Sequence, residues 1–79
     1  MNSAKVISNI IRQERKARKL NQQELADLSG TGLNFISQLE RGKPTVRLDK
    51  LLEVLAVLGL ELHIQRGKQI ISVAKEFEK

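Results

Sequence analysis

The feature that most constrains this sequence is a pair of short apolar segments joined through a glycine. Two short helices can cross at a steep angle only if a small residue lies where they touch and a flexible residue lies in the turn. Ala26 supplies the small residue, and Gly30 supplies the turn four residues later. Leu25, Ile36 and Leu39 fall where their side chains point back to a common core. This register predicts two crossed helices joined by a tight turn, with a plain helical hairpin as the alternative.

Capping residues mark where these helices begin and end. Asn21, with Glu24 three residues later, forms a capping box that predicts the start of one helix, and Gly30 is the expected end. Thr31 is the expected cap of the next helix, which Gly42 should stop. Helical periodicity also predicts a first helix between Ser3 and about Leu20, and a last helix between about Thr45 and Gly59.

The hydrophobic period changes from helical to alternating at Leu60. Leu60, Leu62 and Ile64 alternate with polar residues, which is the period of a half-buried strand. It is the one clear strand signal in the sequence, and a lone strand leaves its edges unpaired. We therefore expect residues 60–66 to form a dimerisation strand that pairs antiparallel with its copy, through these three side chains. Residues 67–79 are ambiguous between strand and helix; a helix, or a tail that orders on a partner, is the prediction.

The composition limits how such a chain can be stabilised. Its 79 residues form one small domain of marginal stability, and small domains often depend on disulfides, metals or partner chains. There is no cysteine, and His63 is the single histidine, so we expect neither a disulfide, a metal nor another cofactor. This raises the expectation of an oligomer. No secretory signal or membrane-spanning run is visible, which predicts a soluble, cytoplasmic protein with no membrane partner.

The positive charge is concentrated in one half of the chain. The net charge is +5; residues 1–50 hold ten Lys or Arg against five Asp or Glu, whereas residues 51–79 hold four against four. A basic half indicates a polyanionic partner such as nucleic acid or an anionic membrane. On charge alone, a solvated helix face is an equal alternative.

The glycines do not form a nucleotide-binding loop. A dinucleotide fingerprint needs three glycines after a strand, but Gly30 and Gly32 follow a predicted helix and Phe35 stands where the third should be. A phosphate loop needs Ser or Thr after Gly-Lys, and Lys43 is followed by Pro44. No nucleophile–base pair or carboxylate cluster accompanies them, so we expect no enzymatic activity.

Residues 21–43, NQQELADLSGTGLNFISQLERGK, resemble the phage-repressor-like (Xre/Cro-type) helix-turn-helix family. With the flanking helices, the resemblance covers residues 4–58. It implies a mainly α, lambda-repressor-like four-helix DNA-binding domain over residues 1–59, followed by one short C-terminal β-strand that pairs across a dimer. The matching pieces are Gln-x-Glu-Leu-Ala from Gln22 to Ala26, Gly30, Ile36-Ser37, and Glu40-x-Gly from Glu40 to Gly42.

The continuation LGLELHIQ, residues 58–65, resembles more narrowly the HipB-type antitoxins, whose strand after the last helix pairs across a dimer. This implies an antitoxin of a toxin-antitoxin system that represses its own operon and binds a HipA-like serine/threonine kinase toxin. A free-standing phage-type repressor and a small helical protein-interaction module are the alternatives. A protein-binding face would favour aromatic or aliphatic anchors, and only Leu33 and Phe35 could serve.

The resemblance also implies roles for individual residues. The third helix would lie in the major groove, where the amides of Asn34 and Gln38 match the donor and acceptor pair of an adenine edge. Leu33 could touch a thymine methyl group or pack on Phe35. Arg15 and Glu40 are expected to form a structural ion pair. On a palindromic double-stranded operator, the expected DNA contacts are Gln22, Gln23, Thr31, Leu33, Asn34, Ser37, Gln38, Arg41, Lys43 and Arg47.

Overall fold

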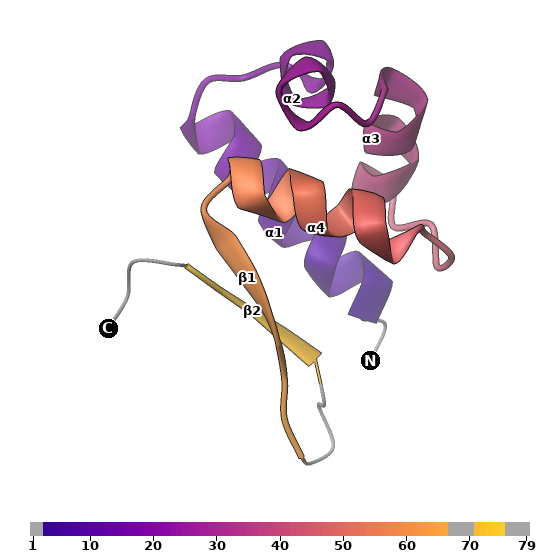
Figure 1. Cartoon of the computed structure of the whole chain (residues 1–79), viewed down its shortest axis with the longest axis vertical. Helices are drawn as coiled ribbons and strands as arrows, with labels where there is room; N and C mark the ends of the chain where they lie inside the picture. Colours follow the sequence, from indigo (N-terminus) through magenta and orange to yellow (C-terminus); the bar gives the residue numbers. More distant parts are fainter. Residues whose placement is uncertain (1–2, 67–70, 76–79) are drawn as a thin grey trace.

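Four helices and a two-stranded antiparallel sheet make up the described part of the chain. The computed structural model describes residues 3–66 and 71–75. In Figure 1, α2 and α3 lie at one end of the helical body and the two strands extend from the other end. No helix within these ranges is long and apolar enough to cross a membrane. The elements are α1 (Ser3–Ala17), α2 (Gln22–Ser29), α3 (Leu33–Glu40), α4 (Leu48–Val57), β1 (Leu60–Ile64) and β2 (Ile71–Lys75).

The predicted caps of α2 are confirmed. The Asn21 side chain accepts a hydrogen bond from the Glu24 amide at 2.7 Å, and the Glu24 carboxylate accepts one from the Asn21 amide at 2.8 Å. Gly30 ends the helix at φ 68°, and its amide N–H donates to the last carbonyls of α2. A Cβ at Gly30 would meet no atom within 4 Å, so the left-handed backbone, and not a close approach, is what favours glycine there.

The start of α3 differs from the prediction. Gly32 is the cap residue, at φ 99°, and it makes no side-chain capping bond. Thr31 is buried, and its hydroxyl lies 2.8 Å from the Ser29 hydroxyl. Because Ser29 donates its own hydrogen to the Leu25 carbonyl at 2.7 Å, Thr31 is the donor of this pair. The prediction that Thr31 caps α3 is therefore wrong: its hydroxyl is bonded inside the turn.

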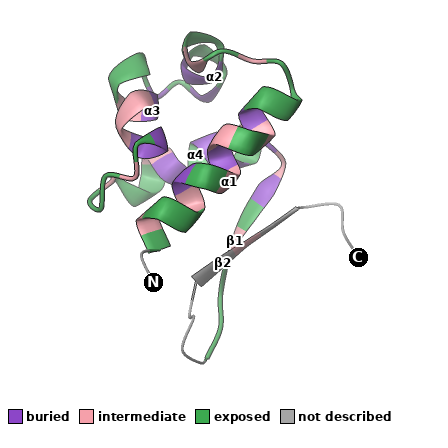
Figure 2. Cartoon of the chain, turned by 180° about the vertical axis from the view of Figure 1, so that it is seen from behind, coloured by how far each residue is buried: buried purple, intermediate pink, exposed green. Residues whose placement is uncertain are grey.

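The hydrophobic core lies where α4 meets the inner faces of the other elements. Ala26 is 2% exposed, as a small residue at the crossing of α2 and α3 should be. Figure 2 shows the buried residues of the helices facing inward and their exposed residues facing out. The core contains Ile11, Leu25, Ala26, Ile36, Leu39, Leu51, Val54, Leu55, Leu58 and Leu60.

The C-terminal segment corrects two predictions. β1 is not a lone strand, because β2 of the same chain pairs with it antiparallel, with Leu62 opposite Val73. The prediction of a helix in residues 67–79 is wrong for Ile71–Lys75; residues 67–70 and 76–79 lie outside the described part. The physical reason is that pairing with β1 satisfies the backbone of this segment while Leu62 and Val73 both pack against the core.

This pairing changes what the three predicted dimerisation residues can do. Leu60 is 4% exposed and belongs to the core, and Leu62 packs against it, so both stabilise their own chain. Ile64 is different, because 76% of its surface is exposed. A strand in a two-stranded sheet still has one unpaired edge. A dimer through β1 therefore stays a prediction, with Ile64 as its available side chain.

Candidate nucleic-acid interface

α3 presents one polar side to solvent. Ile36 is fully buried and Leu39 is 4% exposed, which fixes one side of this two-turn helix in the core. Asn34 is exposed and Gln38 half-buried; being four residues apart, they share a face. Ser37 is half-buried on the same helix. The core contacts thus determine which α3 side chains a ligand can reach.

Leu33 and Thr31, both expected to contact DNA, differ in accessibility. Leu33 begins α3 with 43% of its surface exposed, so a ligand can reach it. Thr31 is 8% exposed and hydrogen-bonded within the turn, so its placement does not favour a contact. Phe35 is partly buried against the core, with the Lys50 ammonium 5.7 Å from its ring centre. The exposed apolar residue at the start of α3 is therefore Leu33.

The predicted ion pair between α1 and α3 is confirmed. Arg15 Nε donates to Glu40 Oε2 at 2.7 Å, and Arg15 Nη2 donates to Glu40 Oε1 at 2.9 Å. Both residues are buried. A third guanidinium donor, Nη1, reaches the Leu20 carbonyl at 2.8 Å. The hydrogen bond to Glu40 raises the pKa of Arg15 above its ordinary value, although burial opposes this, so the guanidinium stays charged.

Gln22 joins this pair, which the sequence did not reveal. Its Nε2 donates to Glu40 Oε1 at 3.1 Å, so the first residue of α2 is tied to the last residue of α3. The expected phosphate contact from this side chain would have to use its other amide hydrogen. The free backbone N–H groups at the start of α2 can still meet a phosphate. Gln23 also has a partner, since its Nε2 donates to Asp27 Oδ1 at 2.9 Å.

Three exposed cations follow the polar side of α3 in the sequence. Arg41 and Lys43 lie in the segment after the helix, and Lys43 Nζ donates to Gln38 Oε1 at 3.2 Å. An ammonium has three donors, so this bond leaves others for a phosphate. Arg47 precedes α4 and holds Asp49 through Nη2 at 2.8 Å. This hydrogen bond lowers the pKa of Asp49.

The geometry suits an elongated, negatively charged ligand with hydrogen-bonding edges. Amides and a hydroxyl on α3 can donate and accept, and the cations that follow can neutralise phosphates. The bidentate Arg15–Glu40 pair and the Gln22 bond link α1, α2 and α3. The polar face therefore lies on helices that are bonded to one another and not on a loop.

Comparison with known proteins agrees with this arrangement. Residues 11–65 match the family model described as Helix-turn-helix, which spans the chain from within α1 to just past β1. Over 58 residues the chain is 47% identical to y4mF of Sinorhizobium fredii (strain NBRC 101917 / NGR234), an uncharacterized HTH-type transcriptional regulator. The alignment covers 73% of this chain and 76% of that protein. The chain belongs to the helix-turn-helix family of DNA-binding transcriptional regulators.

Proposed function

We propose that this regulator is a sequence-specific repressor that binds a palindromic operator as a homodimer, with α3 in the major groove. The observation that carries the proposal is the polar side of α3. Asn34 and Gln38 lie one turn apart, and each amide can donate to and accept from an adenine edge. Arg41, Lys43 and Arg47 would neutralise phosphates on either side, which positions the protein without reading sequence. A chain bound in this way would block polymerase at its operator.

The dimer is proposed to form through the edge of β1 that β2 leaves unpaired. Ile64, 76% exposed, offers an apolar contact beside that edge. A two-fold axis through the paired strands would let two copies of α3 read half-sites about 34 Å apart, one turn of DNA. Leu60 and Leu62 would support the strand from inside each chain.

Replacing Ile64 with lysine is expected to weaken the dimer by about tenfold to a hundredfold, because it removes buried apolar area and places a charge in the interface. Sedimentation of the purified full chain measures this. Leu52→Lys is the matched control, since Leu52 is 46% exposed on α4, outside the strand. A dimer that Leu52→Lys disrupts and Ile64→Lys preserves would place the interface on α4 instead. Leu62→Lys is a poorer test, because Leu62 packs against the core.

Within this function, we propose an antitoxin that represses its own operon and binds a HipA-like serine/threonine kinase toxin. The support is the resemblance of residues 58–65, which comprise the turn after α4, β1 and the residue that follows β1. In Figure 1, β1 extends away from α2 and α3, so a partner held at its far end would not compete with DNA for the reading face. A free-standing repressor would use the same DNA contacts without this partner.

The finer proposal has a direct test in co-expression. The gene beside this chain's own is expected to encode a kinase, which should co-purify with the chain. Both proteins together are expected to repress a reporter placed behind the shared promoter. Repression without a co-purifying kinase would leave the free-standing repressor, whereas a promoter that the chain does not repress would contradict autoregulation.

A further inference from the structure

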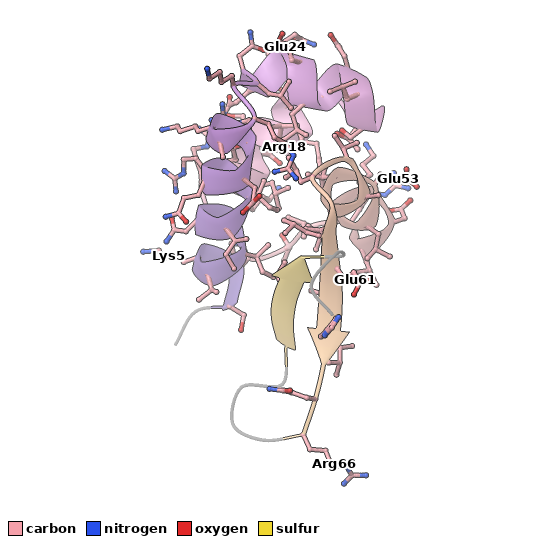
Figure 3. All side chains as sticks on the ribbon, turned by 90° about the vertical axis from the view of Figure 1, so that its left-hand side faces the viewer. Lys5, Arg18, Glu24, Glu53, Glu61 and Arg66 are labelled. Carbon is pink, nitrogen blue, oxygen red and sulfur yellow. The ribbon has the colours of Figure 1, made fainter. Side chains whose placement is uncertain are left out.

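A polar hollow lies between α1 and the end of α3, apart from the exposed amides of α3. Its volume is about 470 Å³. The α1 residues that line it are spaced so that they share one face of the helix. Figure 3 shows Lys5 on the outer side of α1, whereas Arg18 lies on the side toward α4 and β1. The lining residues are Lys5, Ser8, Asn9, Arg12, Glu40 and Arg41.

The charges around this hollow favour an anion. Lys5, Arg12 and Arg41 bring three cations to it, against the single carboxylate of Glu40. That carboxylate is already bonded on both oxygens, to Arg15 at 2.7 and 2.9 Å and to Gln22 at 3.1 Å. The negative charge of Glu40 is therefore compensated by Arg15 of α1 and by the amide of Gln22 of α2. The remaining charge in the hollow is positive.

Several donors in the hollow remain available to a ligand. Arg12 Nη2 donates to Asn9 Oδ1 at 2.7 Å, which leaves the other guanidinium N–H groups and the Asn9 amide NH₂. The Arg41 guanidinium makes no hydrogen bond or ion pair with any residue in 3–66 or 71–75. Guanidinium forks match the paired oxygens of a phosphate.

The two walls of the hollow are held at a fixed spacing. Arg15 and Glu40 join α1 to α3 at one side. At the other, Gly42 passes so close to α1 that a Cβ there would lie 3.3 Å from Lys5 Cγ, and its φ of 82° also favours glycine. The backbone segments that carry the donors are therefore positioned before a ligand arrives, which lowers the entropic cost of binding.

We propose that this hollow binds a phosphate group. Resting on the proposed function, it would take a backbone phosphate of DNA next to the segment that α3 reads, because Arg41 follows α3 directly and continues its surface. Inorganic phosphate offers the same oxygen chemistry and is the other source of such a ligand. The hollow thus gives the basic face of α1 a contact role beyond long-range attraction.

The test compares Arg12→Gln with Arg66→Gln in the full chain. Arg66 is exposed at the far tip of the strands, distant from Lys5 in Figure 3, so both variants lose one charge but only one alters the hollow. Affinity for an operator duplex is measured across salt concentrations, and circular dichroism checks the fold. The proposed homodimer carries two hollows, so Arg12→Gln should reduce the slope of log affinity against log salt by about 1.8. The affinity of this variant should then fall about 12-fold less than that of the wild type between about 50 and 200 mM salt, while Arg66→Gln follows the wild type.

A second arm separates the two phosphate sources. Inorganic phosphate is titrated into the DNA-free chain while the amide resonances of Asn9, Arg12 and Arg41 are followed. One outcome is that phosphate causes saturating chemical-shift changes in the wild type that Arg12→Gln abolishes, while Arg12→Gln leaves the salt slope of DNA binding unchanged. This outcome would support the phosphate site but overturn its assignment to DNA. An unchanged slope and no saturable shifts would overturn the inference altogether.

The preference for operator over scrambled duplex keeps this result separate from the proposed function. It should be the same in wild type and Arg12→Gln, because a phosphate contact carries no sequence information. A wild type without any preference would contradict the proposed function, whereas the salt slope of Arg12→Gln would still decide whether the hollow holds a DNA phosphate. The phosphate titration would still decide whether the hollow is an anion site.

Discussion

Replacing both Asn34 and Gln38 with alanine is expected to abolish the preference of this regulator for its operator over unrelated DNA. Each bidentate amide–adenine contact contributes about 1–3 kcal/mol of discrimination. The proposed homodimer would lose two such contacts in each of its two half-sites, which should lower the ratio of operator affinity to scrambled-DNA affinity by at least about 700-fold. Fluorescence anisotropy with two labelled duplexes measures this ratio.

The fold should survive this double substitution, because Ile36 and Leu39 still hold α3 to the core. Gln23→Ala is a matched control: it removes an exposed amide from α2 that donates to Asp27. If Gln23 binds a phosphate, this substitution would weaken binding to both duplexes alike and leave their ratio unchanged. A folded double variant that discriminates as well as the wild type would contradict the assignment of α3 as the reading helix.

Replacing Glu40 with glutamine is expected to lower the free energy of unfolding by about 3 kcal/mol, the lower end of the range for breaking a buried pair. The Arg15 guanidinium, 9% exposed, would stay buried without a counter-charge, and the link between α1 and α3 would weaken. This is a large fraction of the stability of so small a domain. Urea unfolding followed by circular dichroism at neutral pH measures the change.

Asp49→Asn provides the control, because Arg47 and Asp49 form the same kind of forked pair at the surface. Their side chains are 68% and 66% exposed, so solvent screens the interaction and little change is expected. Since Arg47 lowers the pKa of Asp49, any contribution is present above the ordinary aspartate pKa and is lost as the pH falls through the lowered value. Equal effects of Glu40→Gln and Asp49→Asn would contradict a stabilising role for the buried pair.

Local signals in the sequence predicted most of the helical architecture. The capping box can be recognised within four consecutive residues, from Asn21 to Glu24, and the left-handed end of α2 can be recognised from Gly30 alone. The crossing of α2 and α3 follows from the small Ala26 and the apolar positions around it. Arg15 and Glu40 are 25 residues apart, and their pairing followed from the family resemblance and not from local chemistry.

What the sequence did not predict depends on contacts between distant segments. The hydrophobic pattern of residues 71–75 fits both a helix and a strand, and pairing with β1 favours the strand. From the sequence, Gln22 is recognised only as the first residue of a helix, and its hydrogen bond to Glu40 depends on the fold. Threonine is a common helix cap, but in this turn the Thr31 hydroxyl is hydrogen-bonded to the Ser29 hydroxyl. The hollow likewise combines residues of α1 with Glu40 and Arg41, which lie far from them in the sequence.

The central claim is that α3 reads DNA sequence, and selection from a randomised duplex pool by the purified wild-type chain tests it most directly. The expected result is enrichment of one palindrome whose half-site centres lie about 34 Å apart, one turn of DNA. The proposed adenine contacts of Asn34 and Gln38 predict A·T pairs at fixed positions in each half-site. Binding that enriches no sequence above the input pool would contradict the claim.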